Sequence, residues 1–222
     1  MSFELKSITE IEQRQAVITE IERAVFTRRY NLSSKHYSIF AKNSISMLYA
    51  IWEGFIQTIF GLYIDEINAI NPRLFELHQN IIIFCNENEF PQFLEYPRKS
   101  NKKLLFLKKL RTHFSNEHYK IPRQVNTKSN VSLEVLNNLL EQFNIETYPD
   151  QWDDYKYPKP NLRENLSSFL RIRNSISHGG ELLPGESINQ EDYERFKRLC
   201  IKLMYDIRNK MINASNKKSF LN

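Results

Sequence analysis

The sequence predicts an all-α fold, a helical bundle with long core helices. Apolar residues recur at spacings of three, four and seven along most of the chain, and no alternating stretch is long enough for a useful β-strand. Only 5 of the 222 residues are glycine and 41% are hydrophobic, which excludes disordered, collagen-like and repeat proteins. A chain of this length can bury roughly 70% of its unfolded surface. We therefore expect one domain over residues 1–222 that folds without a disulfide or a metal.

The first two predicted helices reach residue 70. Apolar periodicity places an amphipathic helix between residues 9 and 30. Ser33 or Ser34 can cap a second helix, and no breaker follows until an Asn-Pro pair, which gives an unusually long helix over about residues 34–70. The middle of this helix, residues 49–57, is apolar on most sides. We expect it to be the central core helix.

Three shorter helices are predicted over residues 73–86, 101–114 and 133–143. The turns between them fall at Pro91, Pro97 and Pro122, because proline lacks the N–H of a helical hydrogen bond and clashes with the preceding turn. Residues 145–160 are rich in proline, aspartate and aromatic side chains. They form a predicted loop.

Two more helices complete the predicted bundle. The first covers residues 161–178 and is closed by Gly179-Gly180, since glycine tolerates the left-handed conformation at a helix end. The last covers residues 189 to about 214, with Asn189 as its cap and acidic residues in its first turn. The long helices are expected to pack around seven residues: Ile51, Trp52, Phe55, Leu170, Ile176, Ile201 and Met204.

Several classes of protein are excluded. The first twenty residues hold no apolar run, which excludes a signal peptide, and Glu53 interrupts the most apolar stretch, at 45–64, so we expect no membrane span. Cys85 and Cys200 are too few and too distant for a disulfide framework, which favours a soluble cytoplasmic protein. We find no phosphate-binding glycine loop, Cys-x-x-Cys pair or helical histidine pair, so we expect no cofactor and no metal.

Basic residues are concentrated in one segment, although the net charge of +5 is modest. Seven of them fall within fourteen positions that hold no acid: Arg98, Lys99, Lys102, Lys103, Lys108, Lys109 and Arg111. Such a run can follow a phosphate backbone, where affinity grows with the number of neutralised charges. It can equally be a solvated helix face whose long side chains shield neighbouring leucines.

An arginine occupies the apolar stripe of the helix over residues 161–178. Leu162, Leu166, Phe169 and Ile176 define the stripe, and Arg173 lies on it. A guanidinium there is costly unless it is paired or faces a crevice. Glu53, a lone acid in the core helix, is either the partner that orients this arginine or a charge that reaches solvent.

A histidine lies near this arginine at the end of the same helix. His178 follows Asn174 by four positions and Arg171 by seven, so the three share a helical face. The Asn174 side chain can fix the tautomer of the imidazole. The carbonyl dipoles of the helix end favour its protonated form. A structural alternative is that Arg173 pairs with Glu53 across the core and His178 binds the last helix carbonyls.

Residues 173–178, Arg-Asn-Ser-Ile-Ser-His, resemble the Arg-polar-x-x-x-His signature of the HEPN superfamily. Residues 48–56, Leu-Tyr-Ala-Ile-Trp-Glu-Gly-Phe-Ile, are similar to the first core helix of the large stand-alone HEPN nucleases typified by cyanobacterial members. Residues 130–140 are similar to the Asn-rich turn and helix of the same group. The resemblance covers roughly residues 35–208 and leaves residues 1–32 poorly covered. Ser177 departs from the commoner alanine, and Arg171 also fits the loosest form of the signature.

The resemblance implies an all-helical, metal-independent endoribonuclease of a toxin or anti-phage type. It implies Arg173 and His178 as catalytic residues, Asn174 as orienting and Glu53 as auxiliary. It also implies a homodimer with a composite cleft, which supplies two histidines for the acid and base roles that cleavage by the 2′-hydroxyl requires. An arginine fork suits the phosphorane. We expect Lys102, Lys103, Lys108, Lys109, Arg111 and Arg171 to bind RNA.

Two alternatives stay open at the level of sequence. One is a non-catalytic HEPN module that binds RNA, nucleotide or a protein partner, and the other is a dimerisation domain without affinity for RNA. A cognate antitoxin or regulatory protein is a possible further partner.

Overall fold

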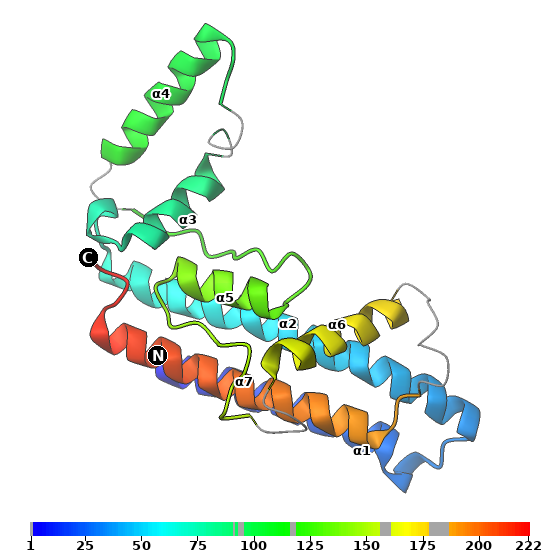
Figure 1. The fold of residues 1–222 in the computed structure, drawn as a ribbon. Helices are drawn as coiled ribbons and strands as arrows, with labels where there is room; N and C mark the ends of the chain where they lie inside the picture. The colour runs from blue at the N-terminus through cyan, green and yellow to red at the C-terminus, as the bar shows by residue number, and fades with distance from the viewer. Residues whose placement is uncertain (1, 91, 93–95, 116–118, 156–160, 178–186) are drawn as a thin grey trace.

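The computed structural model describes the whole chain except residues 1, 91, 93–95, 116–118, 156–160 and 178–186. Its described part is built from helices and contains no β-strand, only two isolated bridges, so the predicted all-α class is confirmed (Figure 1). The helices are α1 (Phe3–Phe26), η1 (Arg28–Tyr30), α2 (Ser34–Ile70), η2 (Leu74–Glu76), α3 (Gln79–Glu89), α4 (Ser100–Ser115), α5 (Leu133–Gln142), α6 (Leu162–Ser177) and α7 (Gln190–Lys217).

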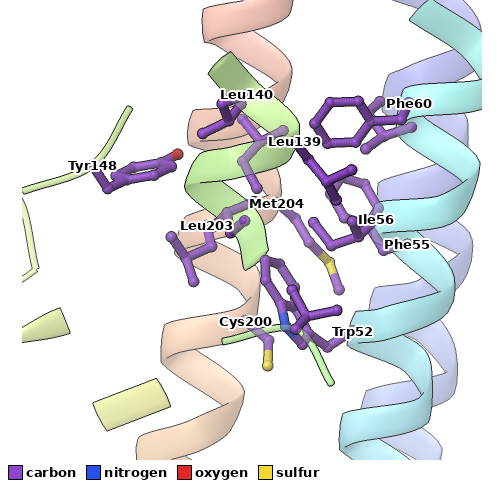
Figure 2. Close-up of a cluster of buried hydrophobic side chains, with 14 of the residues drawn as sticks. Trp52, Phe55, Ile56, Phe60, Leu139, Leu140, Tyr148, Cys200, Leu203 and Met204 are labelled. Atoms are coloured by element: carbon purple, nitrogen blue, oxygen red, sulfur yellow. The ribbon is translucent and has the colours of Figure 1, made fainter. Parts of the chain in front are cut away.

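Three long helices form the body of the molecule. α1, α2 and α7 pack against one another, and α6 packs on α2 (Figure 1). Trp52 and Phe55 of α2 and Met204 of α7 have no exposed surface and lie together between the helices (Figure 2). Leu170 is also buried, while the other predicted core residues, Ile51, Ile176 and Ile201, are half-buried and pack against this core. The predicted centre of the core is therefore confirmed.

The predicted bounds of α2 are confirmed at both ends. The Ser33 hydroxyl accepts a hydrogen bond from the backbone N–H of His36 at 3.3 Å, which caps the first turn. Asn71 ends the helix in the left-handed conformation, with φ of 54°. α2 has the length and hydropathy of a membrane span. Half of its most apolar window is buried inside the protein, where it contributes Trp52 and Phe55 to the core.

A glycine allows α1 to approach α2 closely. Arg14 of α1 donates a hydrogen bond of 2.8 Å to the backbone carbonyl of Ile51. A Cβ atom at Gly54 would lie 3.0 Å from Nη1 of this guanidinium. A larger residue would therefore displace the arginine that joins the two helices.

Two predicted boundaries are wrong. α1 begins at Phe3, not near residue 9, because the Phe3 side chain is buried and packs edge-on against Tyr63 at 5.9 Å. The helix predicted over residues 73–86 is divided into η2 and α3. His78 lies at the division, where its Nδ1 accepts a hydrogen bond from the N–H of Asn80 at 3.3 Å and caps α3.

The predicted loop before α6 lacks a helix in its described part, residues 145–155. Its aromatic side chains are nonetheless part of the core: Tyr148, Trp152 and Tyr155 are 3%, 6% and 5% exposed. The Tyr148 hydroxyl donates a hydrogen bond of 2.6 Å to Asp206 of α7. The Tyr155 hydroxyl donates a second hydrogen bond, of 3.1 Å, to the backbone carbonyl of Arg195, so two tyrosines attach the loop to α7.

Candidate active site on helix α6

Helix α6 presents Arg173 on the face that packs against the core, as the sequence predicts. Leu162, Leu166 and Phe169 on this face are at most 1% exposed, and Ile176 at its end is half-buried. Arg173 lies between Phe169 and Ile176 and is itself half-buried. The face changes from apolar to charged near the end of the helix, which places the guanidinium at the margin of the core.

The Arg173 guanidinium lies over the ring of Tyr49 of α2, with 4.7 Å between its central carbon and the ring centroid. Its Nη1 donates a hydrogen bond of 2.8 Å to the side-chain oxygen of Asn174. Within the described part of the chain, no carboxylate lies within 4 Å of Arg173 to form an ion pair. An aromatic ring and an amide therefore hold the cation without neutralising its charge.

Tyr49 is a rigid support for this arginine. Its side chain is 1% exposed, and its hydroxyl accepts a hydrogen bond of 2.6 Å from the backbone N–H of Val131. Its ring also packs edge-on against Phe169 at 5.3 Å. Burial raises the pKa of Tyr49 to about 12, and this outweighs the opposing effect of the Val131 hydrogen bond. The phenol is therefore neutral at physiological pH.

Glu53 does not form the direct ion pair with Arg173 that one interpretation of the sequence expected. Its Oε1 accepts a hydrogen bond of 2.8 Å from the hydroxyl of Thr127, which is 3% exposed. The amide of Gln57, one turn further along α2, donates to the same hydroxyl at 3.3 Å. Glu53 thus binds the loop between α4 and α5, while its charge still acts on Tyr49.

His178 and the Gly179-Gly180 pair lie outside the residues that the structure describes. The predicted orientation of the imidazole by Asn174 therefore stays a prediction. In the described residues, the side-chain oxygen of Asn174 accepts a hydrogen bond from Arg173. Arg171 is exposed on α6. Of the four predicted catalytic residues, Arg173 and Asn174 are in contact, whereas the carboxylate of Glu53 is bound by Thr127.

The predicted RNA-binding residues lie in two places. Arg171 lies on α6, whereas the five others lie on α4, which stands away from the bundle and from α6 (Figure 1). Four of these five are exposed, and Lys103 is half-buried with its ammonium 5.4 Å from the centroid of the Tyr96 ring. The structure therefore does not bring these six residues together in one patch.

Sequence reasoning did not find Tyr49 and Thr127 as members of the site. Tyr49 precedes Glu53 by one helical turn, so the sequence already places an aromatic ring beside the lone acid of the core helix. This spacing could have identified Tyr49 as part of the site. Thr127 lies in an irregular loop and carries no such signal. Within the described ranges, no group of three or more histidine, cysteine, aspartate or glutamate side chains is placed to bind a metal ion. Cys85 and Cys200 are free thiols, both buried.

Comparison with known proteins identifies the family. The sequence matches the HEPN_MAE_28990-like HEPN family over residues 3–220, a range that includes α1 as well as the segments that resemble HEPN nucleases. Searches of curated proteins and of solved structures found no match to the chain. HEPN domains are often ribonucleases, and this all-helical chain, with Arg173 at the margin of its core, belongs to the HEPN superfamily.

Proposed function

We propose that the chain is a metal-independent RNA endonuclease that cleaves by attack of the RNA 2′-hydroxyl on the adjacent phosphate. Arg173 and His178 are its catalytic residues, Asn174 orients them, and Glu53 is auxiliary. Cleavage by this route gives a 2′,3′-cyclic phosphate and a 5′-hydroxyl. A nuclease of this kind acts on cytoplasmic RNA as a toxin or in defence against phage, and a cognate antitoxin or regulatory protein would restrain it.

The observation that carries the proposal is the way in which Arg173 is held. Its guanidinium is half-buried against Tyr49 and bound to the Asn174 oxygen, and no described carboxylate forms an ion pair with it. Because no described carboxylate neutralises it, the guanidinium can bind an anion that arrives from solvent. The pentacoordinate phosphorane carries additional negative charge on its oxygens, and the fork of arginine donors matches two of them.

Proton transfer is assigned to His178. The 2′-hydroxyl must lose a proton and the 5′-oxygen must gain one, and imidazole, with a pKa near 6.5, does both near neutral pH. One chain provides a single histidine in this segment. We propose that a two-fold homodimer brings the two α6 helices together, so that each cleft contains a base and an acid.

Cleavage of a labelled RNA in the presence of EDTA tests the proposal. The parental chain should cut the RNA and leave 5′-hydroxyl ends, which polynucleotide kinase labels without prior phosphatase treatment. His178→Ala should abolish cleavage while helical content and oligomeric state stay unchanged. His36→Ala is the matched control, because His36 is exposed in the first turn of α2.

Three outcomes would contradict the proposal. Loss of cleavage in EDTA would exclude the metal-independent mechanism. A His178→Ala variant that cuts at the parental rate would exclude the assignment of the histidine. RNA binding without any cleavage by the parental chain would favour the non-catalytic HEPN module.

A further inference from the structure

Helix α4 is fixed to the rest of the protein by its aromatic face. Phe106 and His113 are buried, and both pack edge-on against Phe90, with ring centroids 6.0 and 5.0 Å away. Nδ1 of His113 also lies 3.0 Å from the carboxylate of Glu89 at the end of α3. Although α4 projects from the bundle (Figure 1), its buried face is therefore held in one orientation.

One flank of α4 borders a basic groove. A hollow of about 940 Å³ lies between α4 and the preceding segment, and its basic lining residues are Arg98, Lys99, Lys102 and Lys109. A second hollow of about 460 Å³ follows along the helix and includes Lys108, Thr112 and His113. Leu105 and Lys109 line both hollows, so the two are neighbours along the same flank. We name this pair of hollows the α4 groove.

The charge of the α4 groove favours an anionic ligand. Among the described residues that line it, Glu89 is the one acid, and its carboxylate already accepts a hydrogen bond of 3.1 Å from the Tyr119 hydroxyl beside its contact with His113. Leu104 and Leu107 are 69% and 50% exposed, yet neither lines the groove. Leu105, which is 60% exposed, lines both hollows beside the lysines, so the groove combines basic side chains with one exposed leucine.

An exposed aromatic ring stands in the α4 groove. Tyr96 lines the larger hollow and is 55% exposed. Its ring is positioned by the Lys103 ammonium, 5.4 Å from the centroid, and by an edge-on contact with Phe106 at 5.8 Å. A basic groove for the backbone combined with an aromatic platform for the bases is the arrangement that binds single-stranded nucleic acid. The bases of a duplex are already stacked and cannot reach such a platform.

We propose that the α4 groove binds a single-stranded segment of RNA, with Lys102 and Lys109 on its phosphates and one unpaired base stacked on Tyr96. The choice of RNA rests on the proposed function. Because α4 and α6 stand apart in the structure (Figure 1), the segment held by the groove is distinct from the bond that is cut. The groove thus selects RNAs that carry an unpaired segment at a distance from the cleavage site.

Fluorescence anisotropy of the full-length chain tests this proposal, with His178→Ala as background so that no RNA is cut. The probes are an unstructured 16-nucleotide RNA, the same RNA as a duplex, and anionic phosphatidylserine vesicles. We expect the single strand to bind at least tenfold more tightly than the duplex. Lys109→Glu and Tyr96→Ala should each weaken single-strand binding about tenfold, and Tyr96→Phe, which keeps a ring, should weaken it less.

The matched control is Lys6→Glu, which makes the same change of charge on an exposed position of α1 and should leave binding within twofold. Equal losses for Lys109→Glu and Lys6→Glu would overturn the proposal, because net charge alone would then explain binding. Equal affinity for the duplex, or binding to vesicles but not to RNA, would overturn it as well. Cleavage by the parental chain is measured separately, so a chain that binds but does not cut contradicts the nuclease and leaves the α4 groove supported.

Discussion

The guanidinium of Arg173 lies 4.7 Å from the centroid of the Tyr49 ring, on the boundary between α6 and α2. A cation over an aromatic face gains about 0.5–2 kcal/mol, depending on its exposure, without losing its charge. A carboxylate in the same place would bind the arginine more strongly and neutralise it. The contact therefore both holds the side chain at the margin of the core and leaves it able to attract a phosphate.

Two substitutions of Tyr49 separate the contribution of its ring, which supports Arg173, from that of its hydroxyl, which accepts a hydrogen bond from Val131. Tyr49→Phe keeps the ring under Arg173 but leaves the buried N–H of Val131 without its acceptor. This should cost about 1–3 kcal/mol in unfolding free energy and leave the cleavage rate of the folded protein nearly unchanged. Tyr49→Leu also removes the ring and should lower cleavage about tenfold. Urea unfolding and initial cleavage rates measure the two effects, and equal loss of cleavage in both variants would show that the hydroxyl takes part.

Arg173→Lys tests whether the fork of the guanidinium is needed, because it keeps a positive charge at the site. We expect cleavage to fall at least hundredfold, since one ammonium cannot match two phosphorane oxygens. The unfolding free energy should change by less than about 1 kcal/mol, because only the contact with the ring is weakened. Arg163→Lys, on the exposed side of α6 beside Asp150, is the control and should cut normally. A near-parental rate for Arg173→Lys would remove arginine from the chemistry.

Helix bounds could be predicted from sequence where the terminal residues make local contacts. Ser33 and Asn189 cap α2 and α7 with their own side chains, and Asn189 also forms a capping box with Asp192. The start of α1 was missed because Ser7 occupies a buried position and interrupts the apolar stripe. The break before α3 combines a local contact, the His78 cap, with a distant one, since Leu77 pairs with Leu221 in an isolated bridge. No local pattern contains the distant contact.

The candidate site likewise combines one feature that the local sequence predicts with others that depend on long-range packing. The position of Arg173 follows from the period of α6, which sequence alone contains. The contact with Tyr49 depends on which faces of α2 and α6 meet, and the Glu53–Thr127 hydrogen bond depends on the path of a loop. Both are long-range results of packing. The prediction that Glu53 pairs directly with Arg173 considered only the two charges and could not include a buried hydroxyl that competes for the carboxylate.

Glu53→Gln and Thr127→Val test whether Glu53 acts on cleavage through its negative charge or only through the hydrogen bond that holds Thr127. Glu53→Gln keeps a side-chain oxygen that can accept from Thr127, so stability should change by less than about 1 kcal/mol. The loss of charge should lower cleavage about tenfold if Glu53 is auxiliary to Arg173. Thr127→Val removes the donor and should cost about 1–2 kcal/mol in unfolding free energy. Normal cleavage by Glu53→Gln together with slow cleavage by Thr127→Val would show that Glu53 only positions the loop.

Alkaline pH should destabilise the protein because several buried groups must stay protonated when it is folded. Burial raises the pKa of Cys85 to about 12 and also raises the pKa of Cys200. In the unfolded chain these thiols ionise near pH 8.5, so the unfolded state releases protons first and stability falls as pH rises. Burial likewise raises the pKa of Tyr148 and Tyr193, which adds to the loss above about pH 10.

Each group that remains protonated in the folded state contributes at most about 1.4 kcal/mol per pH unit to this loss. The unfolding free energy from urea titrations should therefore be nearly constant between pH 7 and 8, begin to fall near pH 9 and fall more steeply above pH 10. Cys200→Ala should flatten the first part of the curve, and Tyr193→Phe the second. A stability that stays level to pH 11 would contradict the raised pKa values of these side chains, because the pKa of each group would then be the same in the folded and the unfolded protein.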